Sequence, residues 1–261
     1  MIGFLIRKTF YDLWDNMFRI VVLNIGFLVC VTIPIFLPML AGKFIDSLAL
    51  DLALLAFGIL VCSVYLSAVS YTVGSISDYS TFTFKEFFLN FKHSWLAGLV
   101  MGGFVFLVFL VATVVIPFYF NMQPLAAGLI LLVIILWTTV FALFSFQFYF
   151  SVYARLGKSI KKSIKKCLLI SLDNTGLSIF IFIHNIIGLV ISAILAFMFP
   201  GPAGILLYID EALRLRLLKY DWLEANPDED RKKIPWDVLL IEEREKTGTR
   251  SFRNLIFPWK D

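Results

Sequence analysis

Long apolar stretches alternate with short polar ones along most of the chain. Stretches long enough to cross a bilayer core are expected at about 20–40, 52–73, 95–118, 125–150 and 177–199. A shorter apolar stretch at about 203–218 contains four charged residues. The pattern predicts an all-α polytopic membrane helix bundle with six transmembrane helices. Five is the alternative count if residues 203–218 lie at the membrane surface.

The middle of the chain carries no charge, and this supports the membrane assignment most strongly. No Asp, Glu, Lys or Arg occurs between Lys92 and Arg155, a stretch of 62 residues. As one helix this stretch would be about 93 Å long, or roughly three bilayer cores. The chain must therefore fold back on itself, and the polar turn is expected at Asn121, Gln123 and Pro124.

Three segments have the amphipathic pattern of helices that lie on a membrane surface. Residues 1–19 place Ile6 and Phe10 opposite Arg7 and Lys8, and residues 81–95 mix apolar side chains with lysine. In residues 157–174 an apolar stripe is surrounded by lysines. These lysines are the candidate contacts for anionic lipid headgroups: Lys158, Lys161, Lys162, Lys165 and Lys166. A docking face for a membrane or cytosolic protein partner is the alternative.

Composition excludes several classes of protein. Hydrophobic residues make up 60% of the chain, charged residues only 16%, and the mean hydropathy is +0.87. A soluble globule, a disordered chain, a fibre and a nucleic-acid-binding domain are excluded as the main class. Residues 219–261 hold 19 of the 42 charged residues. They are expected to form a charged cytoplasmic tail with a short helix at about 235–246.

The distribution of Lys and Arg predicts the orientation. Lys and Arg are frequent in the segment before the first span and in the segments after the second, fourth and sixth spans. The loops after the first, third and fifth spans hold one such residue or none. Because cytoplasmic loops carry the excess of positive charge, both termini are expected to be cytoplasmic. The expected location is the cytoplasmic (inner) membrane of a bacterium.

Small side chains within the spans are expected to serve packing. Gly98 and Gly102 form a GxxxG pattern, which is typical of closely packed membrane helices. Cys30, Cys62 and Cys167 have no paired spacing, so they are interpreted as small buried hydrophobic residues rather than a disulfide framework or a zinc site.

Motifs of catalysis are missing from the sequence. It contains no HExxH, GxSxG, GxxxxGK[ST] or GxGxxG pattern and only two histidines. We therefore expect no enzymatic activity, no catalytic residue, no metal site and no cofactor.

The candidate functional feature is a set of polar residues in apolar surroundings. Asp210 and Glu211 fall near the middle of the sixth stretch, where a carboxylate is costly unless it is paired. Asp210 and Arg214 have the spacing of an ion pair on one helix face. A paired network that closes the bundle is the structural interpretation, and a polar path is the functional one. The predicted intramembrane network is Asp210, Glu211, Arg214, His184, Asn185 and Asn24.

Several short patterns resemble the YesL-like family of small bacterial membrane proteins. They are the stretch from Cys30 to Pro34, the run from Phe87 to Lys92, and the pair Ala154-Arg155 followed by a lysine-bearing helix. The resemblance covers roughly residues 15–220. It implies a small integral membrane protein associated with carbohydrate import, and it supplies no catalytic residues.

Together these features lead to a functional hypothesis and one rival. The expected role is a non-enzymatic accessory or regulatory component of a transport or envelope system. The alternative is a small transporter with a polar path through the fifth and sixth spans, where His184, Asp210 and Arg214 would carry the chemistry. A sequence alone names neither the substrate nor the partner.

Overall fold

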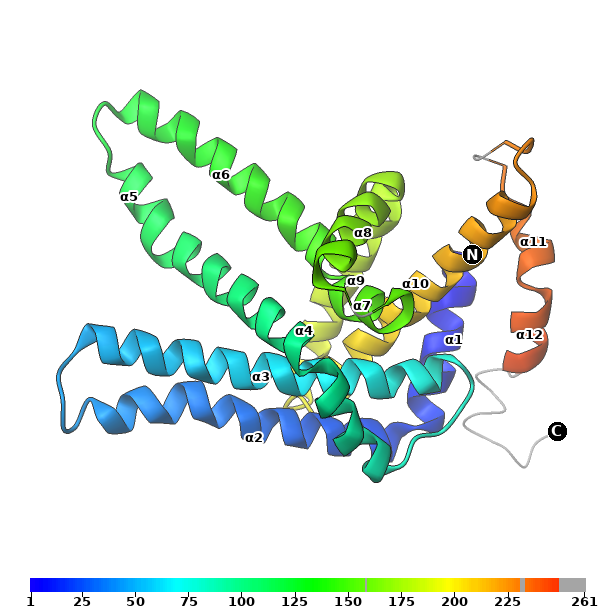
Figure 1. Cartoon of the computed structure of the whole chain (residues 1–261), viewed down its shortest axis with the longest axis horizontal. Coiled ribbons are helices and arrows are strands. Elements are labelled where there is room, and N and C mark those ends of the chain that lie inside the picture. The colour runs from blue at the N-terminus through cyan, green and yellow to red at the C-terminus, as the bar shows by residue number, and fades with distance from the viewer. Residues whose placement is uncertain (158, 231–232, 249–261) are drawn as a thin grey trace.

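The protein is all-helical in a computed structural model that describes residues 1–157, 159–230 and 233–248 (Figure 1). This confirms the predicted fold class. The helices, in chain order, are α1 (Ile2–Asp15), α2 (Met17–Ala41), α3 (Leu48–Ser77), α4 (Phe84–Leu110), the π-helical segment η1 (Val111–Val115), α5 (Ile116–Phe120), α6 (Leu125–Phe146), α7 (Tyr149–Leu156), α8 (Ile160–Asp173), α9 (Thr175–Ile194), α10 (Gly201–Ala225), α11 (Trp236–Leu239) and α12 (Ile241–Thr247).

Five segments in the described part of the chain are long and apolar enough to cross a membrane. They are α2, α3, the continuous run Phe84–Phe120, the run Leu125–Leu156, and α9. The expected sixth span is not among them, because α10 carries Asp210, Glu211, Arg214 and Arg216 within 18 residues. The number of candidate spans therefore equals the alternative of five, but α10 does not take the surface position on which that alternative rested, because it packs against α3 and α9 and its residues from Leu206 to Leu213 are buried.

Two long hairpins diverge from a common base (Figure 1). One is α2 with α3, and the other is α4 and α5 with α6. Close contact between α3 and α4 depends on glycine, since a Cβ atom on Gly98 would stand 2.4 Å from Val64 Cα and one on Gly102 would stand 2.8 Å from a methyl group of Leu60. The GxxxG pattern is thus the contact face of α4 against α3.

Helices α9 and α10 form a third hairpin, and its turn is held by α2. The Asn24 amide donates to the carbonyls of Met198 and Pro200 at 2.9 and 2.8 Å, and its oxygen accepts from the Ala203 amide at 2.9 Å. Asn24 is the eighth residue of α2, so the turn lies about 10 Å along that helix from its start. The α9–α10 hairpin therefore turns back well before the far end of α2.

The N-terminal helix is more deeply integrated than its amphipathic pattern predicts. α1 packs against α10, and its Lys8 side chain is only 2% exposed although the pattern assigns Lys8 to a polar outer face. Ile6 and Trp14 remain exposed. The assignment of Lys8 to the polar outer face is wrong, because Lys8 forms a buried ion pair with Glu211 of α10. The periodicity of α1 alone does not reveal a partner on another helix.

From Phe84 on, the segment 81–95 belongs to α4 rather than to a separate interfacial helix. Thr83 caps the first turn of α4, where its hydroxyl accepts from the Glu86 amide and the Glu86 carboxylate accepts from the Thr83 amide. The helix then continues without a break to Leu110. By contrast, the predicted helix at 235–246 appears as two short helices, α11 and α12.

Candidate functional site

Charged side chains from four helices, α1, α7, α10 and α12, and from the loop after α3 meet at the base of the bundle. We call this group the charged cluster, and it consists of Lys8, Asp12, Asp78, Arg155, Asp210, Glu211, Arg214 and Glu243. Its members are far apart in sequence. The cluster therefore joins the N-terminal helix, the ends of α3 and α7, the middle of α10 and the tail.

Arg155 is the cation that holds Asp210. Its Nε donates to both Asp210 oxygens at 2.9 and 3.0 Å, and its Nη2 also contacts that carboxylate. Nη1 donates to the two oxygens of Asp78 at 3.1 and 3.2 Å. Arg155 lies in the last turn of α7, and Gly157 follows the end of this helix with a φ of 110°. The planar guanidinium thus bridges two carboxylates.

Glu211 lies next to Asp210 but belongs to a different pair. Its oxygens accept from Lys8 Nζ at 3.3 Å and from the Thr9 hydroxyl. Lys8 also contacts the Asp12 carboxylate and donates to the Ser77 carbonyl at 3.1 Å. Burial, as the larger effect, and the Asp12 charge raise the pKa of Glu211, whereas Lys8 and Thr9 oppose the rise.

Arg214 connects the cluster to the tail. Its Nη2 donates to Glu243 of α12 at 2.7 Å, Nε lies 3.4 Å from Asp78, and Nη1 donates to the Ser77 carbonyl. The last carbonyl groups of a helix carry partial negative charge, so cations are favoured at the end of α3. Both Lys8 and Arg214 use the same carbonyl, that of Ser77.

Tyr79 is the aromatic centre of the cluster. It follows the end of α3 with a φ of 58°, and its hydroxyl lies 2.8 Å from a Glu243 oxygen and 3.1 Å from the Thr247 hydroxyl. Lys8 Nζ lies 4.3 Å and the Arg214 guanidinium 5.0 Å from the ring centroid. Burial raises the pKa of the Tyr79 hydroxyl, which therefore stays protonated and donates to Glu243.

The six residues of the predicted network are not brought together. Asp210 binds Arg155 instead of Arg214, so the ion pair expected from the i, i+4 spacing is wrong. Asn24 holds the α9–α10 turn. The His184 ring stacks on Tyr208 at a centroid distance of 3.6 Å, and Asn185 lines a separate apolar cavity. Asp210, Glu211 and Arg214 join the charged cluster, and the other three residues lie at three further places, because the α9–α10 hairpin faces different helices along its length.

Sequence reasoning missed six members of the site, which are Lys8, Asp12, Asp78, Tyr79, Arg155 and Glu243. One signal was available, since Arg155 is the charged residue that ends the long uncharged stretch. The other five lie in segments of ordinary polarity. Only the folded chain brings them to α10.

Helix α8 has the amphipathic arrangement that its sequence predicts. Cys167 is fully buried, and Lys161, Lys162 and Lys165 are exposed. Lys166 is partly buried and donates to the Leu156 carbonyl at 3.0 Å. Lys158 lies outside the described residues.

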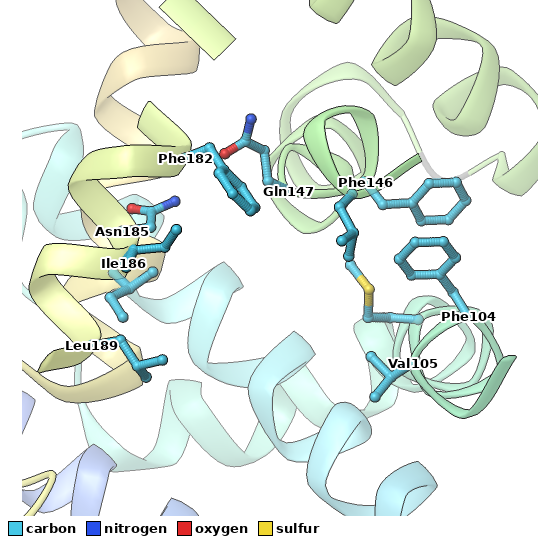
Figure 2. A pocket seen from close by; sticks show the side chains of 11 residues that line it. Phe104, Val105, Phe146, Gln147, Phe182, Asn185, Ile186 and Leu189 are labelled. Carbon is cyan, nitrogen blue, oxygen red and sulfur yellow. The ribbon is translucent and has the colours of Figure 1, made fainter. Parts of the chain in front are cut away.

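An apolar cavity lies between α4, α6 and α9, with Ile205 of α10 also in its lining (Figure 2), and none of its lining residues belongs to the charged cluster. Its volume is about 330 Å³. Nine of the eleven residues that line it are apolar, and the other two are Gln147 and Asn185. Its lining contains no charged residue.

The chemistry of these two places differs. The charged cluster holds carboxylates, two guanidinium groups and an ammonium group in mutual contact, an arrangement that binds segments together. Within the described ranges no group of three or more His, Cys, Asp or Glu residues is placed to hold a metal ion.

No family model, curated protein or solved structure matches this chain.

Proposed function

We propose that this integral membrane protein is a non-enzymatic accessory or regulatory component of a transport or envelope system in a bacterial inner membrane. The observation that carries the proposal is the pairing of the charges. Asp210, Glu211 and Arg214 bind partners on other helices at the base of the bundle, while the cavity between α4, α6 and α9 has an apolar lining without charge. A path for a polar solute would need polar groups along its length.

The resemblance to the YesL-like family supports the same proposal and suggests carbohydrate import as its setting. Under this proposal the cluster end faces the cytoplasm, where the lysines of α8 contact anionic headgroups and the tail is available to a protein partner. The exposure of Lys161, Lys162 and Lys165 supports contact with lipid headgroups.

Two measurements separate an accessory protein from a transporter. The purified protein in liposomes should give no uptake of labelled sugars above empty liposomes. In cells, a photo-crosslinking amino acid in place of Lys162 should capture one defined component of a transport or envelope system. The same crosslinker in place of Trp137, which is 71% exposed on α6, is the control for random contact within the membrane.

Saturable sugar uptake by the protein alone, abolished by Asp210→Asn in a folded protein, would replace this proposal by the transporter. Equal capture of the same proteins from both crosslinker positions would also contradict it.

A further inference from the structure

The apolar cavity between α4, α6 and α9 contains two polar groups with unused hydrogen-bonding capacity. Figure 2 shows Gln147 and Asn185 on one side of the cavity, with Phe104 and Val105 of α4 on the other. The side-chain oxygens of Gln147 and Asn185 are both buried, and neither accepts a hydrogen bond from the described part of the protein. Buried acceptors without donors are unusual, because each loses its contact with water.

The orientation of the Gln147 amide follows from its own contacts. Its nitrogen donates to the carbonyls of Phe144 at 2.9 Å and Ser178 at 3.0 Å. Exchanging the nitrogen and oxygen would place two acceptors against each other, so the oxygen is the unpaired atom. Gln147 therefore presents an acceptor that only a donor from outside the described chain can satisfy.

The cavity is open to the bilayer. Val105, Ile186 and Leu189, three residues of its lining, are 42%, 47% and 49% exposed. These residues belong to segments that are apolar and long enough to span a membrane. A molecule dissolved in the membrane can therefore reach the cavity from the side.

We infer that this cavity binds a neutral long-chain amphiphile with a hydroxyl group. The apolar lining fits a hydrocarbon chain, and the hydroxyl donates to the oxygen of Gln147 or Asn185. An anionic headgroup is disfavoured because no Lys or Arg lines the cavity. A partner helix is disfavoured by size, since a helix with side chains is roughly 10 Å across and the cavity measures about 330 Å³.

The test compares two photoactivatable probes on the full-length protein in phosphatidylcholine nanodiscs. One probe is a long-chain alcohol with a diazirine in its chain, and the other is its methyl ether, which cannot donate a hydrogen bond. The alcohol should label cavity-lining peptides of α4, α6 and α9 saturably. The ether should bind about two- to tenfold more weakly, which corresponds to the loss of one hydrogen bond.

Variants of the lining provide the controls. Asn185→Leu with Gln147→Leu should make the two probes label equally. Because Gln147 also contacts α9 and its loss could impair folding, Leu189→Trp is the second variant, and it should reduce labelling by filling the cavity. Val190→Trp, at a neighbouring position of α9 that is 57% exposed and outside the lining, should leave labelling unchanged.

Equal labelling by both probes in the unaltered protein, or labelling by the alcohol that Leu189→Trp does not reduce, would overturn the inference. Either result would mean that the alcohol only partitions into the lipid around the helices.

Discussion

At the scale of single residues, the chain buries charged groups and pairs every member of the charged cluster with an oppositely charged partner. Asp210 and Glu211 are each 1% exposed, yet each contacts a cation from another helix. A buried pair of this kind adds little net stability compared with a well-packed apolar pair, but removal of one partner leaves a buried charge without compensation. This asymmetry provides a direct test of the contacts.

Arg155→Ala should destabilise the protein by about 3–5 kcal/mol, because Asp210 is left buried without its guanidinium. The double variant Arg155→Ala with Asp210→Ala should be less destabilised than the sum of the two single variants. Thermal unfolding in detergent, followed by tryptophan fluorescence, measures the difference.

Arg244→Ala is the matched control, because Arg244 pairs with Asp237, whose side chain is 94% exposed. Exposed ion pairs contribute little, so this variant should unfold near the parent temperature. If the losses of unfolding free energy from Arg155→Ala and Asp210→Ala simply add in the double variant, the two residues do not interact.

Glu211 should make stability depend on pH. Its pKa in the folded protein is raised above the ordinary value of 4.5, so the folded state holds this proton more tightly than the unfolded state does. The contribution of Glu211 to stability is therefore complete below about pH 4.5 and is lost as the pH rises through the raised folded pKa.

Glu211→Gln cannot titrate, so the variant should lose less stability than the parent protein between pH 5 and pH 8. The measurement is the unfolding temperature of both proteins in the same detergent across this range. Parallel curves for the two proteins would contradict a raised pKa at Glu211.

At the scale of helices, local patterns predicted the elements better than their partners. The long apolar helices and the lysine-bearing α8 follow from the periodicity and length of apolar runs. The burial of Lys8 does not follow, because its partner Glu211 is 203 positions away in sequence. Likewise, the i, i+4 spacing of Asp210 and Arg214 permits an ion pair between them. In the folded protein Asp210 pairs with Arg155 instead, and Arg214 pairs with Glu243.

Gly98→Ala should loosen the contact between α3 and α4. The added Cβ would stand 2.4 Å from the backbone of Val64, which a methyl group cannot tolerate without separating the helices. A loss of about 1–3 kcal/mol is expected from overpacking, measured as a lower unfolding temperature.

Gly103→Ala is the matched control on the same helix, because a Cβ at Gly103 meets nothing within 4 Å. This variant should be neutral or slightly stabilising, since alanine is the better helix former. If the Gly98→Ala variant proved as stable as the Gly103→Ala variant, this result would contradict the close contact between α3 and α4 at Gly98.

At the scale of the whole molecule, the charged cluster connects α1, α3, α7, α10 and the tail at one end of the bundle. The tips of the two long hairpins, near Asp46 and Met122, lie at the far end (Figure 1). The α9–α10 hairpin turns back at Asn24, so the tail returns to the same end as α1 even though α10 is too charged to count as a span. The sequence could not settle this point, because it depends on contacts between Asn24 and a turn that starts about 170 residues later.

The central claim is that α1 and α12 lie on one side of the membrane and meet in the charged cluster. Topology reporters fused after Phe10, Phe84, Ile160 and Leu240 in the otherwise intact chain test it most directly. All four should report the cytoplasm, and reporters after Asp46 and Met122 should report the opposite side. A reporter after Leu240 on the opposite side from the one after Phe10 would contradict the claim, because Glu243 could then not reach Arg214.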